Sequence, residues 1–263
     1  LQREAKIYEF EPPVIRPKGA SIECPRDGRM GAAYVDCLSG EDHVSKATVM
    51  LSYSWGNQLA DVVDALLQFC QDSDVDPKRC YVWICCLCIN QHRVKEAQAK
   101  GETIPFETFK AAFGERVTGI GHVVALMAPW SAPIYISRVW CDFELFTATA
   151  VGDGSIRVTI TMPPKEAEDF RRSLTAGEGT SAVWKALAGL DVREAQASVP
   201  EDRERILALI KDTPGFDEFN SVVSTRLKSW FLQASDGYVR RTMRSGCVGH
   251  DDGSMARLCG RVG

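Results

Sequence analysis

The chain has 263 residues, a formal net charge of -4 and a pI near 5.7, and 45% of its residues are hydrophobic. This length and hydrophobic content suffice for one large domain with its own core. The acidic balance offers no general attraction for nucleic acid, so we expect no nucleic-acid partner. No apolar run approaches the roughly 20 residues that a membrane-spanning helix needs. We therefore expect no transmembrane segment, and peripheral association with a membrane complex stays open.

The cysteines indicate a reducing compartment. Ten are present, and Cys85, Cys86 and Cys88 crowd into one apolar, strand-like run. Adjacent strand residues point to opposite faces, which suits reduced, buried thiols better than disulfides. We expect a cytoplasmic protein, although the chain begins at Leu1 instead of methionine, which leaves a removed leader or a missing upstream domain open.

The first half of the chain predicts an arm followed by alternating strands and helices. Residues 1–45 are rich in proline, glycine and charge, so we expect an extended arm with one or two short strands. "ATVMLSY", residues 47–53, reads as a buried strand, and apolar residues then recur at helical spacing over 59–70. "CYVWICCLCI", residues 80–89, predicts a second buried strand, and the polar stretch 90–105 predicts a loop.

The alternation continues beyond this loop. We expect a helix over about residues 106–117, a third strand in "HVVALMA", a helix through "RVWCDFELFTATA" and a fourth strand in "SIRVTITM". Apolar strands that alternate with amphipathic helices imply a parallel sheet covered on both faces. The predicted fold is α/β, a flavodoxin-like parallel sheet with a C-terminal helical extension.

The C-terminal third predicts helices and then a tail. Ser198 and Glu201 form a candidate capping box before a helix that Pro214 and Gly215 should end. An apolar stripe from Phe216 onward predicts the last helix. The expected organisation is an arm over 1–45, an α/β domain over 46–165, a helical extension packed on it over 166–237, and a glycine-rich tail over 238–263.

The carboxyl ends of the predicted strands carry the candidate site, because ligands of open parallel sheets usually bind there. "SYSWG" follows the first strand and "APW" the third, so this edge should gather the following side chains: Ser52, Tyr53, Ser54, Trp55 and Trp130. On a helix through "VWCDFEL", Glu144 faces inward with Cys141, while Asp142 points the opposite way. A buried carboxylate costs free energy unless it is compensated, so Glu144 needs a reason that Asp142 does not.

These segments resemble those of a known family. "TVMLSYSWG" and "RVWCDFEL" look like the first and last signature boxes of Toll/interleukin-1 receptor (TIR) domains. "INQHR", "GIGHVVALMAPW" and "PEDRERILALIKDTPGF" further resemble a diverged TIR-like branch found in algae and other protists. The resemblance spans roughly residues 48–230, with strong motifs joined by weakly matching sequence. It implies a TIR-like fold and makes an organellar, plastid location the alternative to the cytoplasm.

The resemblance implies two functions. In enzymatic TIR domains the glutamate of the last box cleaves the nicotinamide–ribose bond of NAD, and by position this residue is Glu144. Trp55, Tyr53 and Trp130 would then supply apolar or stacking walls. Many other TIR domains are adaptors without catalysis. Cys85 stands where an acid is expected in these relatives, which weakens the enzymatic alternative.

The chain therefore supports two hypotheses. The first is a protein-interaction module, an adaptor or peripheral subunit that self-associates or joins a larger complex and requires no cofactor. The second is an NAD glycohydrolase with NAD as substrate and Glu144 as its catalytic group; the other reading of Glu144 is a structural carboxylate that ties its helix to the sheet. We expect no metal site, because neighbouring thiols of a strand diverge and do not converge on one zinc ion.

Overall fold

The computed structural model describes residues 3–102, 114–150 and 155–246, with side chains up to 237. These residues contain a four-stranded parallel sheet in the order β2-β1-β3-β4. Its strands are β1 (Val49–Ser52), β2 (Val82–Trp83), β3 (His122–Leu126) and β4 (Arg157–Thr161). The predicted α/β class and its parallel sheet are confirmed.

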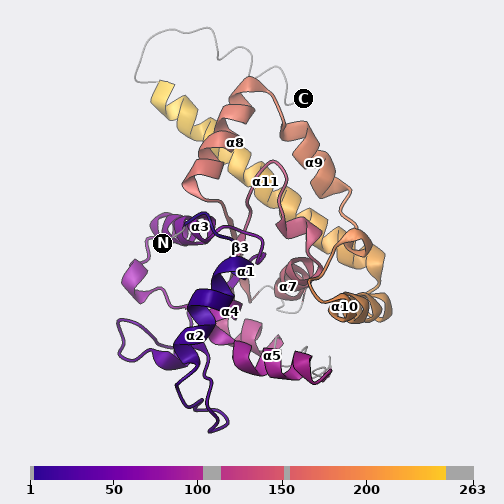
Figure 1. The fold of residues 1–263 in the computed structure, drawn as a ribbon. Helices are drawn as coiled ribbons and strands as arrows, with labels where there is room; N and C mark the ends of the chain where they lie inside the picture. The colour runs from indigo at the N-terminus through magenta and orange to yellow at the C-terminus, as the bar shows by residue number, and fades with distance from the viewer. Residues whose placement is uncertain (1–2, 103–113, 151–154, 247–263) are drawn as a thin grey trace.

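Side chains of the central strands alternate between two hydrophobic cores. Met50 and Val123 face one core, while Leu51 and Val124 face the other. The first core is formed with the later helices: α7 (Val139–Ala150), α8 (Pro164–Ala176), α9 (Thr180–Ala188), α10 (Pro200–Asp212) and α11 (Phe216–Gly246). The second core is closed by α3 (Leu59–Asp72) and the N-terminal segment, which lie on the other side in Figure 1. Helices thus cover both faces, as a buried parallel sheet requires.

The N-terminal segment is helical, and the expected extended arm is not what the structure shows. It forms α1 (Ile7–Phe10), a π-helical turn (Glu11–Ile15) and α2 (Arg16–Gly19), followed by a 3-10 turn (Tyr34–Cys37). Ile7 and Ile15 are buried in the second core. Pro12, Pro13 and Pro17 lie at the second or third position of these turns, where a missing N–H costs little.

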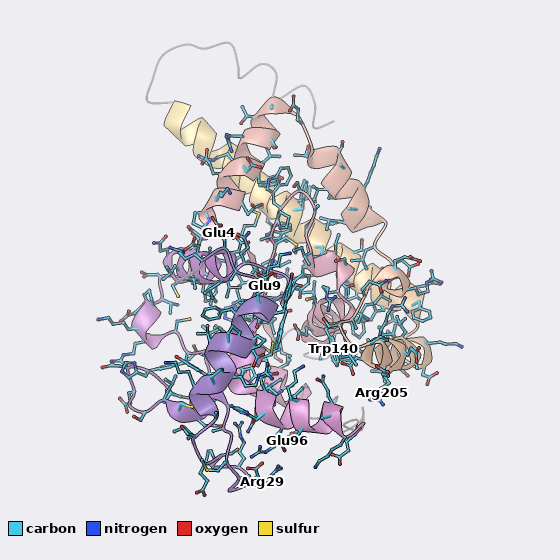
Figure 2. The ribbon with its side chains drawn as sticks, in the orientation of Figure 1. Glu4, Glu9, Arg29, Glu96, Trp140 and Arg205 are labelled. Carbon is cyan, nitrogen blue, oxygen red and sulfur yellow. The ribbon has the colours of Figure 1, made fainter. Side chains whose placement is uncertain are left out.

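Salt bridges form within the N-terminal segment and between it and the rest of the chain. The buried Glu11 carboxylate accepts two hydrogen bonds from Arg16, each 3.1 Å long. Arg29 pairs with Glu96 on α5 (Gln91–Ala99), which lies beside the segment in Figure 2. These contacts fix the segment on the domain, although its side chains Tyr8, Val14, Ile22 and Met30 remain exposed.

The second predicted strand is wrong over most of its length. Only Val82–Trp83 pairs as a strand, and Cys85–Cys88 forms the helical turn α4. The stretch expected to be a loop is helix α5, whose first turn is capped by the Asn90 side chain accepting from the His92 N–H at 3.0 Å. An apolar run of this length does not distinguish strand from helix, which explains the error. The argument against zinc from strand geometry does not hold for these thiols.

The other predicted elements are confirmed with shifted ends. β1, α3, β3, α7 and β4 fall where the apolar periodicity places them. The helix expected over 106–117 lies mostly outside the described residues, and 114–120 is helical. Helix α10 ends before Pro214 as predicted, but its N-cap is Val199, so the predicted Ser198 capping box is absent. Ser198 instead accepts a hydrogen bond from Arg138.

The last helix is longer than expected. Helix α11 continues to Gly246, past residue 238 where the tail was expected to begin, and residues 247–263 lie outside the described parts. Phe219, Val223 and Leu227 are buried against the first core, as the stripe predicts. Among the described helices, none combines the length and apolarity needed to cross a bilayer.

Candidate functional site

Glu144 meets the end of the central strand at the carboxyl edge of the sheet. The Ser52 hydroxyl, at the last position of β1, donates a hydrogen bond to the Glu144 carboxylate on α7 at 2.5 Å. The Tyr135 hydroxyl lies 2.7 Å from the same Ser52 oxygen. Ser52 and Tyr135 are almost completely buried. The predicted meeting of Glu144 with the strand end is what the structure shows.

Burial changes the acid–base chemistry of this group. Desolvation raises the pKa of Glu144 to about 7, although the hydrogen bond from Ser52 opposes the rise. Burial also raises the pKa of Tyr135 well above its usual value, so this phenol stays protonated. The Glu144 carboxyl group therefore exchanges a proton near neutral pH. Such a group can act as a general acid or base, or it can simply be a carboxyl held in an apolar place.

Two of the predicted wall residues hold a thiol near Glu144. The Trp55 indole N–H lies 3.1 Å from the Cys85 sulfur, and the Cys85 thiol donates to the Tyr53 hydroxyl at 3.5 Å. Burial raises the pKa of Cys85 to about 11, and the nearby Glu144 charge adds to the rise. Cys85 is thus a neutral thiol that takes part in the cluster through hydrogen bonds.

The remaining predicted wall residues have partners elsewhere. The Ser54 N–H donates to the Asn57 side chain at 2.9 Å, and the Ser54 hydroxyl accepts from the Gly56 N–H at 3.1 Å, which closes the turn after β1 on itself. The Trp130 main-chain N–H donates to Glu166 at 2.7 Å, and its indole N–H donates to Asp169 at 3.1 Å, both on α8. The Trp130 side chain is buried against α8, and both of its hydrogen bonds described above are to carboxylates of that helix.

Asp142 is the residue that the sequence analysis misjudged. Its side chain is completely buried, and neither carboxyl oxygen has a hydrogen-bond partner among the described residues. Burial raises its pKa well above the usual value. Val139 and Leu145, one turn away on either side, are also completely buried. The signal was available, because a helix that is apolar all round is buried all round, and α7 is such a helix.

Two cavities among the described residues lie away from Glu144. One, of about 490 Å³, borders β2, and another, of about 410 Å³, lies at the start of α11. Neither is lined by Glu144, Ser52 or Trp55. Within the described residues, no three His, Cys, Asp or Glu side chains are grouped so that they could hold a metal ion. All eight cysteines in these parts are free thiols.

No family model matches the chain, and no curated protein or solved structure matches it either.

We predict that stability falls with rising pH and that Glu144 causes part of the fall. A glutamate has a pKa of about 4.3 in an unfolded chain. Because the folded value is raised to about 7, the folded state binds more protons between these two values. The stabilisation is complete below about pH 4.3 and is lost as the pH rises to about 7. Urea unfolding of wild type and Glu144→Gln at pH 5 and 7.5 measures it.

From pH 5 to pH 7.5, the free energy of unfolding of Glu144→Gln should rise relative to that of wild type by about 1–2 kcal/mol. This figure allows for the partial exposure of the Glu144 side chain. Glu178→Gln is the matched control, since Glu178 is exposed. An equal change with pH in all three proteins would contradict the prediction.

A second prediction concerns Asp142. To remain buried and neutral, it must keep a proton at neutral pH, whereas the unfolded chain releases it. Asp142→Asn removes this cost, so the free energy of unfolding at pH 7.5 should rise. The exposed Asp212→Asn should change it little. Unfolding curves in urea measure both, and a less stable Asp142→Asn protein would show that the carboxyl group has a partner that it needs.

Proposed function

We propose that this chain is a TIR-like protein-interaction module, an adaptor or a peripheral subunit of a larger assembly. The observation that carries the proposal is the hydrogen bond from Ser52 to Glu144. This bond occupies the Glu144 carboxyl group, which a TIR-type NAD glycohydrolase would need for contact with its substrate. In this role the bond ties α7 to the central strand.

Two further features support the interaction role. The Trp130 side chain, expected to line a ligand pocket, is bonded to α8 and buried. The larger cavity lies along the outer edge of β2, where protein chains can be recognised through main-chain groups. Because the N-terminal segment is packed on the domain, a partner would meet a formed surface and would not have to order an arm.

One observation favours NAD hydrolysis as the second candidate. Cleavage of the nicotinamide–ribose bond builds positive charge on the ribose, and water then completes the reaction to ADP-ribose, nicotinamide and a proton. A carboxyl group with a pKa of about 7, near the Cys85 thiol that Tyr53 and Trp55 contact, suits such a step. This candidate requires that Glu144 leave Ser52 when NAD binds.

Nicotinamide release by concentrated protein separates the two functions. We expect no release from wild type above that of the Glu144→Gln protein. Glu144→Ala, which removes the bond acceptor and leaves a gap, should lower the free energy of unfolding by about 1–3 kcal/mol. Ser52→Ala is the matched control for the same bond and should also be destabilised. Release by wild type that disappears in Glu144→Gln, while that variant keeps its melting temperature, would replace the proposal with the enzyme.

A further inference from the structure

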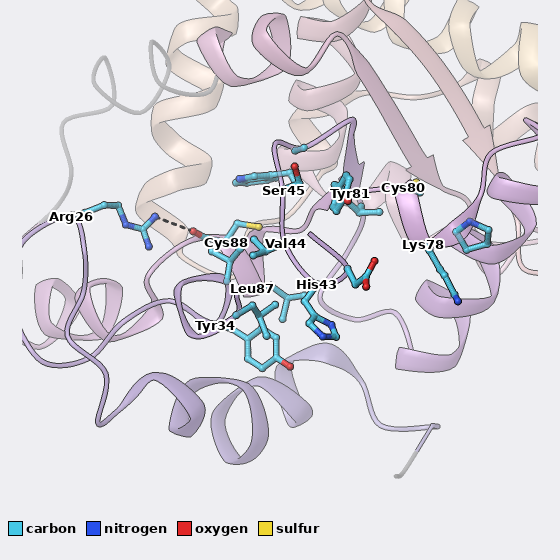
Figure 3. A pocket seen from close by; sticks show the side chains of 17 residues that line it. Arg26, Tyr34, His43, Val44, Ser45, Lys78, Cys80, Tyr81, Leu87 and Cys88 are labelled. Atoms are coloured by element: carbon cyan, nitrogen blue, oxygen red, sulfur yellow. Dashed lines mark hydrogen bonds between the residues drawn. The ribbon is translucent and has the colours of Figure 1, made fainter. Parts of the chain in front are cut away.

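A groove runs beside β2, the strand at one edge of the sheet. Its volume of about 490 Å³ falls within the range of about 300–1,000 Å³ typical of binding pockets. One wall comes from the segment 34–47, with Tyr34 and Val44, and the other comes from Tyr81 and Leu87. Figure 3 shows these side chains between Arg26 at one end and Lys78 at the other. We call it the β2 groove.

The strand edge that borders the groove has unused main-chain groups. The Val49 N–H donates to the Tyr81 carbonyl at 3.3 Å, and Val49 pairs with Val82 in parallel register. In this register the N–H and C=O of Val82 point away from β1. No bond to either group is recorded among the described residues, and Val82 lines the groove. An added strand would find a donor and an acceptor there.

The wall opposite β2 is fastened in place. Tyr81 donates its hydroxyl proton to the Glu41 carbonyl at 2.5 Å, and Arg79 pairs with Asp42 at 3.1 Å. At the other end Arg26 pairs with Asp36 and also donates to the Cys88 carbonyl at 3.4 Å, the bond drawn in Figure 3. These bonds hold the groove open before any ligand arrives, which reduces the entropy lost on binding.

The charges around the groove are not balanced. Arg26 and Asp42 each have a partner of opposite charge, but Lys78 has no carboxylate within ion-pair distance in the described parts of the chain. One positive charge of the groove, that of Lys78, thus remains without an ion-pair partner among the described residues. An acidic residue of a ligand would complement it.

We propose that the β2 groove binds an extended acidic peptide segment as an additional strand beside β2. Main-chain bonds to Val82 hold the segment, alternate apolar side chains enter between Val44 and Leu87, and an acidic residue meets Lys78. This inference deepens the proposed interaction function and rests on it, since it names the surface and the chemistry of the partner.

The test uses the full chain against displayed ten-residue peptides that are apolar at alternating positions. Half of them carry two aspartates at one end, and the other half carry two lysines there. We expect enrichment of the acidic half, and the best acidic peptide is then synthesised and its affinity measured by fluorescence anisotropy. Enrichment of the lysine half, or of neither, would overturn the proposal.

Val82→Pro is the decisive variant. It removes only the outward N–H, which β1 does not use, and proline is tolerated at such edge positions. The affinity should fall about tenfold, as expected for one lost main-chain bond. Val82→Ala keeps the N–H and is the matched control, with a change of at most about threefold. Equal binding by Val82→Pro would overturn the added strand.

Further measurements cover the case in which Val82→Pro does not fold. Single N-methyl groups are then introduced along the peptide. If the peptide is an added strand, its affinity falls at alternate positions only, and an equal fall at every position would overturn the proposal. Lys78→Glu should weaken the acidic peptide about fivefold, which corresponds to one exposed ion pair. Sedimentation showing a dimer that Val82→Pro abolishes would assign the groove to a second copy and overturn the peptide.

The outcomes also distinguish failure of the groove proposal from failure of the proposed interaction function. If no peptide binds and Glu144 variants show no effect on nicotinamide release, the groove proposal fails and the module remains. If release depends on Glu144, the proposed function fails whatever the groove binds.

Discussion

The hydrogen bond from Ser52 to Glu144 joins the end of the central strand to a helix that is buried on almost every side. Helix α7 lies between the sheet and the two last helices, so most of its side chains are shielded from bulk water. Ser52 supplies a donor to Glu144, while Asp142 has none among the described residues. Both carboxyl groups of this helix are desolvated, Asp142 completely and Glu144 in part, and burial raises the pKa of each.

The fold was predictable where the sequence carries a long, regular signal. β1 and β3 are continuous apolar runs followed by helices of twelve or more residues, and these patterns have one reading. The apolar run 80–89 is compatible with either a strand or a helix, and tertiary contacts decide which of the two forms. The sharp turn into α4 lets Trp55 and Tyr53 reach Cys85, and nothing in the local sequence reports that need. The N-terminal turns were missed for a similar reason, since Ile7 and Ile15 reveal their burial only against the sheet.

The candidate site was predictable to the same degree. The rule that parallel strands expose ligands at their carboxyl ends places Ser52 near the start of α7, and the inward position of Glu144 follows from helical spacing. Trp130 shows where such reasoning ends. Its partners Glu166 and Asp169 lie on a later helix, and only the folded chain brings them to it. Asp142 was misjudged by assuming that a helix has one solvated face, an assumption that fails for a helix covered from both sides.

A ligand would meet different groups at the carboxyl ends of the strands and along the outer side of β2. The carboxyl edge is occupied by the chain's own side chains, since Glu144, Ser54 and Trp130 all have internal bonds. The β2 edge keeps main-chain groups free beside a formed groove. Exposed strand edges invite unwanted pairing, and proteins usually cover or charge them. Here the segment 34–47 is fastened opposite β2 and leaves room between the two, and Lys78 stands at one end. With a positive charge at its end and free main-chain groups at Val82, this strand edge favours an acidic incoming strand over a basic one. Such selectivity is what an interaction module would need.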